Sequence, residues 1–162
     1  MEIRPYHGRH WKKKAKADRL PATYSRLQGV GHLLAFYDLY EDTMFGYIRK
    51  RKRWKEFLDV LQLMRRKYPS GERIYLILDN FSPHRRKEIR KWAKNNMVKL
   101  IWTPTNASWL NRIECQFTEI RKFVFDNSNY KSHCEVNLAL RKFITYRNKR
   151  NLKRKLIKLK RH

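Results

Sequence analysis

The feature that most restricts the fold of this chain is an apolar run of five residues, Ile74–Leu78 (IYLIL), which ends directly at Asp79. Apolar and polar residues do not alternate within it, as they would in a strand with one face in water. Such a run is typical of a strand that other elements cover on both faces. The run therefore predicts an α/β protein in which Asp79 stands at the carboxyl end of a buried strand.

A second strand is predicted at Val98–Trp102 (VKLIW), after a helix that begins near Ser82. Ser82 is a suitable N-cap residue, and Pro83 is a suitable first helical residue. The inward face of this helix is formed by Ile89, Trp92 and Ala93. A strand, a helix and a strand of these lengths form a right-handed crossover, so we expect the two strands to lie parallel in a mixed sheet.

The segment before the buried strand predicts a hairpin and a helix. Two short stretches, Val30–Tyr37 and Met44–Arg49, are rich in β-forming residues and are separated by a polar turn, which predicts an antiparallel pair. A helical stripe of apolar residues follows and ends before Pro69. The stripe consists of Trp54, Phe57, Leu58, Leu61, Met64 and Tyr68. We expect this helix to cover the sheet.

Two further helices are predicted after the second strand. Ser108 is a suitable N-cap for a long amphipathic helix, on which Glu114 lies about 100° round from the apolar stripe, at the border between core and solvent. The stripe consists of Leu110, Ile113, Phe117, Ile120 and Val124. Another helix is predicted from near Glu135, and no acidic residue follows that position. Its inward residues are Leu140, Phe143 and Ile144.

The chain is strongly basic, with 40 Lys and Arg residues against 14 Asp and Glu residues and a formal net charge of +26. So large a charge repels itself unless a polyanion neutralises it, which favours a nucleic acid as the partner. The densest basic run is a candidate for contacts with the DNA backbone, although most such runs are solvated faces. It consists of Arg49, Lys50, Arg51, Lys52 and Arg53. No apolar stretch is long enough to span a membrane and no signal peptide is visible, so we expect a cytoplasmic protein.

Two sequence signatures connect the chain to a known family. Leu78–Arg86 (LDNFSPHRR) and Thr103–Glu114 (TPTNASWLNRIE) resemble the two signatures of mariner-type DDE transposases, in the bacterial insertion-sequence branch. Thirty-four residues separate Asp79 from Glu114, an interval typical of that superfamily. The resemblance covers nearly the whole chain.

The resemblance implies a ribonuclease H-like mixed sheet flanked by helices, within a partial DDE catalytic domain at residues 1–134 and a basic helix and tail at 135–162. It implies metal-dependent DNA cleavage and strand transfer, with transposon ends and target DNA as partners and a homodimer when complete. Asp79 and Glu114 would be the catalytic residues and metal ligands. Because oxygen ligands favour Mg²⁺ or Mn²⁺, we expect one of these ions in a two-metal site.

Each of these residues also has a plainer interpretation. A strand-terminal Asp often starts a turn, and a lone Glu on a helix is usually a surface residue. Asn80, His84 and Asn111 are candidates for supporting hydrogen bonds or phosphate contacts. A structural role in the turn after Asp79, or at the start of the helix, is at least as well supported for these three.

The family's first catalytic Asp lies on its first strand, a few residues before the segment that matches EIRPYHG here. In this sequence no acidic residue occupies that position, so we expect the first strand to be missing. Its absence would leave unpaired edges and a gap between the hairpin and the parallel strands, and hence marginal stability. The chain would then be a truncated, inactive copy. Two alternatives stay open, a non-catalytic basic nucleic-acid-binding remnant and another ribonuclease H-like nuclease.

Overall fold

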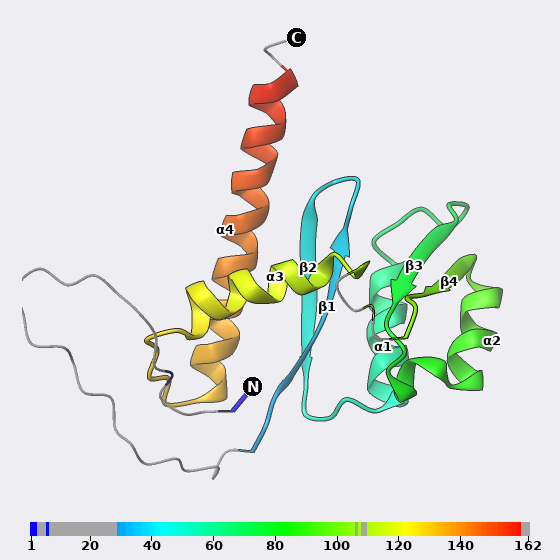
Figure 1. The fold of residues 1–162 in the computed structure, drawn as a ribbon, viewed down its shortest axis with the longest axis horizontal. Coiled ribbons are helices and arrows are strands. Elements are labelled where there is room, and N and C mark those ends of the chain that lie inside the picture. The colour runs from blue at the N-terminus through cyan, green and yellow to red at the C-terminus, as the bar shows by residue number, and fades with distance from the viewer. Residues whose placement is uncertain (3–5, 7–28, 106, 108–109, 160–162) are drawn as a thin grey trace, which may run out of the picture.

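The computed structural model describes Met1, Glu2, Tyr6 and residues 29–105, 107 and 110–159. Along the chain, an antiparallel hairpin is followed by a helix, two parallel strands with a helix between them, and two helices at the carboxyl end (Figure 1). None of the described helices has the length and apolar content to cross a bilayer.

The predicted hairpin is confirmed. Strand β1 (His32–Asp38) pairs antiparallel with β2 (Thr43–Arg49), and the register runs from His32 opposite Arg49 to Asp38 opposite Thr43. The Asp38 carboxylate closes the turn, because its Oδ1 accepts the backbone N–H groups of Tyr40 and Glu41, each at 2.9 Å. Such short polar side chains suit tight turns.

The strand, helix and strand unit is confirmed in its topology and corrected in its first turn. Strand β3 (Ile74–Leu78) pairs parallel with β4 (Val98–Trp102), as predicted. The segment from Ser82 is a separate 3₁₀ turn, η1 (Ser82–Arg85), and helix α2 (Lys87–Asn95) begins only after Arg86. Arg86 is extended, with ψ of 145°, so the predicted N-cap at Ser82 is wrong. Proline fits the start of either kind of helix, and the sequence did not separate them.

Helix α1 (Trp54–Arg65) buries Phe57, Leu61 and Met64 of its predicted apolar stripe together with Val60, while Trp54 and Leu58 are half-buried and Tyr68 lies beyond the helix end. Four residues of α1 are buried in the first hydrophobic cluster, and these are Phe57, Val60, Leu61 and Met64. The cluster also holds Phe36 of β1, Leu78 of β3 and Ile89 of α2, so it spans the hairpin and the parallel unit.

Within the described residues, the strands form two separate two-stranded sheets, β1–β2 and β3–β4, instead of one mixed sheet. Both predicted strand orientations are present, but no ladder joins the two pairs. No described strand lies between β1 and β3, and the missing first strand stays a prediction. One consequence corrects the prediction for the apolar run, since Tyr75 of β3 is 58% exposed instead of covered.

The amphipathic helix that carries Glu114 starts later than predicted. Helix α3 (Ile113–Ile120) runs into a π-helical turn, η3 (Arg121–Phe125). Leu110 precedes the helix and is 52% exposed, so its predicted inward place is wrong. The predicted N-cap at Ser108 lies outside the described residues.

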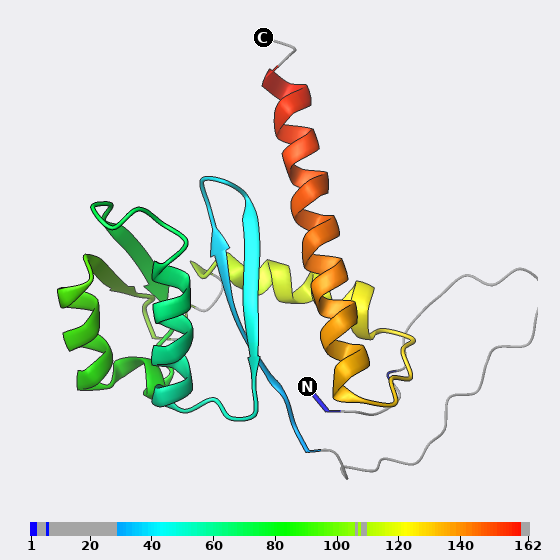
Figure 2. The same ribbon diagram turned by 180° about the vertical axis from the view of Figure 1, so that it is seen from behind.

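The last helix, α4 (His133–Leu159), begins two residues before the predicted start at Glu135. The helix packs beside β2 and η3, and its last turns project beyond the body of the molecule (Figure 2). The second hydrophobic cluster joins these elements through Met44, Ile120, Val124, Phe125, Val136, Leu140 and Phe143. The boundary predicted at residue 134 stays a prediction.

A buried arginine of α4, Arg147, contacts both the hairpin turn and α3. Arg147 of α4 is 2% exposed, and its guanidinium lies 3.1 Å from the Asp42 carboxylate, 2.7 Å from the side-chain oxygen of Gln116 and 3.6 Å from the Glu119 carboxylate. It also lies over the Tyr37 ring, 5.2 Å from its centroid. One side chain thus links the hairpin turn, α3 and α4.

Candidate functional site

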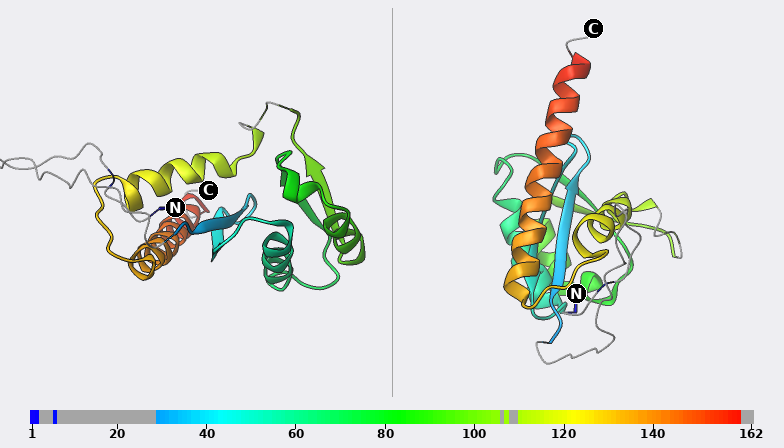
Figure 3. Two further views of the ribbon diagram at one scale, coloured as in Figure 1. Left: turned by 90° about the horizontal axis from the view of Figure 1, so that it is seen from below. Right: turned by 90° about the vertical axis from the view of Figure 1, so that its left-hand side faces the viewer.

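The candidate site lies at a cavity of about 940 Å³ between the hairpin and the parallel strands. Strands β1 and β3 line two of its sides, α1 contributes Phe57 and Met64, and α3 contributes Ile113 and Phe117. Seen from below, α3 passes on one side of the strands while α1 lies on the other (Figure 3, left). Of the predicted site residues, Asp79, His84, Asn111, Glu114 and Lys52 line this cavity.

Asp79 follows β3 directly, and the turn after it holds its carboxylate on one side. The Oδ1 atom accepts the backbone N–H of Phe81 at 3.2 Å and lies 2.8 Å from Nδ1 of His84. No hydrogen bond to Oδ2 is formed by the described residues. The side chain is 42% exposed, so Oδ2 remains available to a ligand.

The His84 ring is fixed by aromatic neighbours. Its centroid lies 4.1 Å from that of Phe57 and 5.3 Å from that of Phe81, and the side chain is 16% exposed. Burial lowers the pKa of His84, and the nearby Asp79 carboxylate opposes this only in part. The ring is therefore neutral near pH 7, and its Nδ1–H donates to Asp79.

Glu114 reaches the same cavity from the first turn of α3 and is exposed. Its backbone N–H bonds the carbonyl of Asn111 at 3.0 Å, which closes the turn before the helix. No hydrogen bond to the Glu114 carboxylate is formed within the described part of the chain. Glu114 therefore lacks the fixed orientation that Asp79 has.

Asn80 does not line the cavity. Its Nδ2 donates to the carbonyl of Thr103 at 2.8 Å, and the Thr103 N–H donates to the carbonyl of Leu78 at 2.9 Å. These two bonds join the carboxyl ends of β3 and β4. The geometry gives Asn80 a structural role beside Asp79, which was the plainer of its two interpretations.

The basic run at 49–53 divides into paired and unpaired residues. Arg49 lies 2.5 Å from the Asp59 carboxylate, and Arg53 lies 2.5 Å from the Glu56 carboxylate, so α1 neutralises both in part. Lys50 and Arg51 are exposed and make no ion pair with any described residue. Lys52 lies over the Phe81 ring at 5.2 Å from its centroid, on the rim of the cavity.

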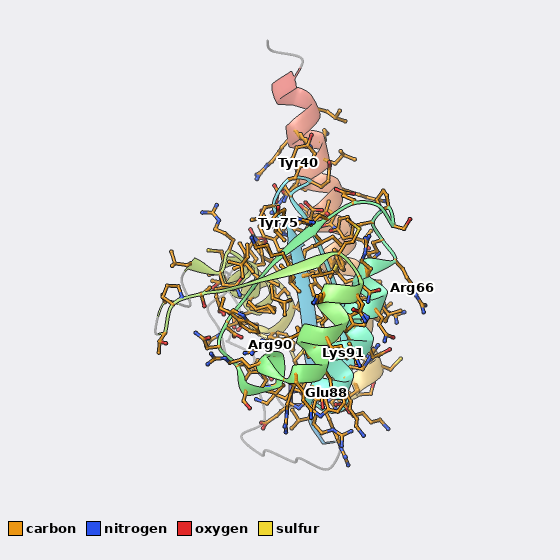
Figure 4. The ribbon with its side chains drawn as sticks, turned by 90° about the vertical axis from the view of Figure 1, so that its right-hand side faces the viewer. Tyr40, Arg66, Tyr75, Glu88, Arg90 and Lys91 are labelled. Carbon is orange, nitrogen blue, oxygen red and sulfur yellow. The ribbon has the colours of Figure 1, made fainter. Side chains whose placement is uncertain are left out.

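A second basic surface was not singled out from the sequence. Arg90 and Lys91 are exposed on α2, where Figure 4 shows them on the outer side of the helix. Their signal lay in the helical spacing, because Lys91 falls opposite the buried Ile89 and Ala93 and Arg90 falls on the flank of the helix. Glu88, beside them, adds one acidic side chain.

The carboxylate oxygens of Asp79 and Glu114 meet part of what a hard divalent cation requires. Within the described residues, no group of three or more His, Cys, Asp and Glu side chains gathers at one point. Asp79 and Glu114 still offer carboxylate oxygens to one cavity. Mg²⁺ keeps several waters and is commonly held by one or two carboxylates, so the chemistry of these oxygens fits such an ion, and the two-metal site stays a prediction.

Known proteins resemble this chain in sequence and in fold. Part of the chain is 25% identical, over 89 residues, to the uncharacterized 39 kDa protein of insertion element IS630 from Shigella sonnei, covering 54% of this chain and 26% of that protein. The chain thus spans about a quarter of that relative's length.

The fold is similar to that of a chain in the simian T-cell lymphotropic virus intasome solved with the PP2A regulatory subunit B56 gamma. The TM-score is 0.52 at 16% identity, over 68% of this chain and 45% of that one. The HTLV-2 integrase catalytic core domain, solved in complex with magnesium, aligns with a TM-score of 0.48 at 14% identity, over 86% of this chain and 87% of that one. The fold is α/β and ribonuclease H-like, as predicted.

The family model described as DDE superfamily endonuclease matches residues 1–137, most of the chain. The match contains the parallel strands with Asp79, the helix with Glu114 and the turn with His84. Together with the IS630 relative, it confirms the family to which the two signatures pointed. The chain belongs to the DDE superfamily of endonucleases.

Proposed function

We propose that this chain is the catalytic part of a transposase that cleaves DNA and joins strands at insertion-sequence ends. The observation that carries the proposal is the arrangement of Asp79 and Glu114, which come from different elements and line one cavity. The DDE family match and the net charge of +26 support DNA as the substrate.

Asp79 and Glu114 would hold Mg²⁺ or Mn²⁺ through carboxylate oxygens. In phosphodiester cleavage such an ion lowers the pKa of the attacking water or hydroxyl and stabilises charge on the leaving oxygen. His84 has a different part, since its Nδ1–H holds Oδ1 of Asp79 and leaves Oδ2 free. Hydrogen bonds of this kind fix the orientation of a ligand before the metal arrives.

Lys50 and Arg51 would contact the DNA backbone, because they lack the carboxylate partners that Arg49 and Arg53 have. Lys52, on the cavity rim, would bring a phosphate towards the two carboxylates. Such contacts are independent of base sequence and weaken with salt.

The two carboxylates also set a limit on what this chain does by itself. We expect it to bind divalent metal and DNA without turning over, because three carboxylates make the family's full site. A plasmid assay tests this expectation. Supercoiled DNA in Mg²⁺ should stay intact with the wild-type chain, and nicking that Asp79→Asn abolishes would contradict the inactive state while supporting the transposase chemistry.

The DNA surface is tested by two double variants with equal charge change. Lys50→Ala with Arg51→Ala should lower the slope of log affinity against log salt by about 1.8, at about 0.9 per lost phosphate contact. Arg49→Ala with Arg53→Ala should change it much less, because those side chains are already paired. Equal slopes for both variants would remove this run from the proposed interface.

A non-catalytic DNA-binding protein is the second candidate function, favoured by the basic surfaces that need no metal. It predicts that DNA affinity is the same with Mg²⁺, with a chelator and in Glu114→Gln. The transposase proposal predicts weaker binding without the metal, because the uncompensated carboxylates then repel phosphate.

A further inference from the structure

An exposed aromatic ring lies where η3 packs against α4 (Figure 2). Phe123 belongs to this π-helical turn, a kind of turn that often marks functional sites, and is 66% exposed. Its ring stacks on that of Phe143 of α4, with the centroids 5.6 Å apart and an interplanar angle of 18°. Phe143 is 9% exposed. One face of the Phe123 ring is therefore covered by Phe143, and the other face is open.

A second exposed aromatic residue lies on the next turn of α4. Tyr146 is 61% exposed and follows Phe143 by three residues, so the two side chains are neighbours on the helix surface. Lys142 and Lys149, four residues before Tyr146 and three after it, are exposed beside it. Neither lysine forms an ion pair with any described residue. Phe123, Phe143 and Tyr146 are called the aromatic patch below.

The acidic residues near the aromatic patch already have basic partners. Glu119, one helical turn before the exposed ring, lies 3.6 Å from Arg147 and 3.4 Å from Arg150. Asp126, on the other side of the ring along the chain, lies 3.9 Å from Arg121. Helix α4 has no acidic residue after its first turn. The lysines beside the aromatic patch therefore keep a positive charge that no neighbouring carboxylate compensates.

An open ring face with positive charge beside it matches the chemistry of an unpaired nucleotide. Every base has a flat π-face that stacks on an aromatic side chain, while basic side chains attract the phosphates of the same strand. Bases inside a duplex do not offer this face, because they are stacked on their neighbours. A protein partner matches less well, because lysine is depleted at protein interfaces.

We propose that the aromatic patch binds unpaired DNA. One base stacks on the open face of Phe123, Tyr146 offers a ring to a second base, and Lys142 and Lys149 contact the phosphates. The stacking is independent of base sequence, because every base has a π-face.

The aromatic patch is separate from the metal site. Phe123 lies nine residues after Glu114, about two and a half helical turns, which places the two side chains on opposite sides of the helix. Phe123 is also absent from the lining of the cavity that Glu114 reaches. The patch rests on the proposed function only for DNA as the nucleic acid, and its substitution leaves both carboxylates in place.

Binding of a fluorescent single strand to the full chain tests the proposal. The probe is an oligothymidine strand with one central 2-aminopurine, a base whose fluorescence falls when it stacks, and the same strand in a duplex is the control. The wild type should quench the single strand on binding. Phe123→Leu keeps an apolar side chain on Phe143 and removes the ring, so it should lower single-strand affinity about 10-fold or more and abolish the quenching.

Three further measurements make the test specific. Phe123→Tyr, which restores a ring, should keep both the affinity and the quenching. Leu152→Ala removes an apolar side chain of similar exposure, 54%, on another side of α4, and should change neither. Duplex affinity should change less than about twofold in Phe123→Leu, because phosphate contacts dominate it. Thermal melts of the variants should match the wild type, since Phe123 is exposed.

Four results would overturn the aromatic patch alone. The single strand could bind without quenching, Phe123→Leu could weaken single-strand and duplex binding equally, or Leu152→Ala could match its effect. Finally, sedimentation could show a wild-type dimer that Phe123→Leu dissociates, which would make the patch an interface between copies of this chain. In all four cases, duplex binding and Mn²⁺ affinity of the wild type would leave the transposase proposal standing. A wild type that binds neither form of DNA would overturn both proposals.

Discussion

Asp79 and Glu114 line the same cavity, but hydrogen bonds hold the Asp79 carboxylate and none holds the Glu114 carboxylate among the described residues. Asp79 ends a strand, and one of its oxygens is held by the Phe81 N–H and by His84, which is itself packed on Phe57. Glu114 stands in the first turn of α3, exposed and without a hydrogen-bond partner for its carboxylate in the described residues. Helix α3 is anchored further along, where Arg147 reaches Gln116 and Glu119.

The difference separates two tasks that a metal site requires. The Asp79 carboxylate is oriented before any ligand arrives, so little ordering remains to be done when it binds. The Glu114 carboxylate has no hydrogen-bond partner among the described residues, so its order must come from the ligand. We therefore expect substitutions next to Asp79 to change metal affinity, and substitutions in the distant anchor of α3, which carries Glu114, to change stability.

Among the residues that support the two carboxylates, His84 beside Asp79 is expected to give the largest effect. Replacing His84 by Phe keeps a ring against Phe57 and removes the Nδ1–H donor. We expect Mn²⁺ affinity to fall by about 10- to 100-fold, the usual cost of losing a hydrogen bond that orients a ligand, with little loss of thermal stability. His84→Asn, which restores a donor, should recover part of the affinity. Calorimetric Mn²⁺ titration with thermal melts measures both, and unchanged affinity in His84→Phe would end the positioning role.

The anchor of α3 gives the next largest effect. Arg147→Met should lower the free energy of unfolding by about 1 to 3 kcal/mol, because it leaves the polar groups of Asp42, Gln116 and Glu119 without their partner. Arg150→Met is the matched control. Arg150 meets the same Glu119 at 3.4 Å but is more exposed, so its loss should cost under about 1 kcal/mol. Urea unfolding of both variants checks this, and equal losses would show that burial of Arg147 adds nothing.

Substitution of Glu114 itself should leave stability nearly untouched. Glu114→Ala removes no hydrogen bond within the described residues, so the free energy of unfolding should change by no more than about 0.5 kcal/mol. A larger loss in urea unfolding would mean that Glu114 has a structural partner, and the contrast with Asp79 would then be wrong.

The smallest effect concerns pH. Burial alone would raise the pKa of Asp42, but hydrogen bonds from Tyr37 and Arg147 and the Arg147 charge outweigh it and lower the pKa. A lowered carboxyl pKa adds stability above the ordinary value of about 3.9, and this is lost as pH falls through the folded-state pKa. Unfolding between pH 5 and pH 3 should therefore depend on pH less steeply in Asp42→Asn than in the wild type. Identical dependence would show that Asp42 is not coupled to Arg147.

Local patterns predicted much of this molecule correctly. The hairpin, the parallel strands, α1 and the position of Asp79 after β3 all follow from apolar periodicity and turn residues, which act over a few positions. The wrong predictions concern features that apolar periodicity does not determine, such as where a helix begins. Leu110 keeps the spacing of the apolar stripe, yet the helix has not begun at that point.

The remaining features depend on contacts between distant segments. Arg147 sits in a basic stretch that looks like a solvated face, and its partner Asp42 is 105 residues away. Tyr75 belongs to a run whose pattern predicts coverage on both faces, but its side chain is 58% exposed, because coverage depends on which distant segments pack there and not on the run itself. The joint position of Asp79 and Glu114 was suggested by family resemblance and not by spacing alone.

The central claim is that Asp79 and Glu114 together bind one divalent ion, and Mn²⁺ titration of four proteins tests it most directly. These are the wild type, Asp79→Asn, Glu114→Gln and the double variant. A metal–carboxylate contact is worth several kcal/mol, and each 1.4 kcal/mol is a factor of ten, so each single variant should lose about 100-fold in affinity or more. The double variant should lose little beyond either one, because one ligand alone does not hold the ion. Wild-type affinity in either single variant would contradict the claim.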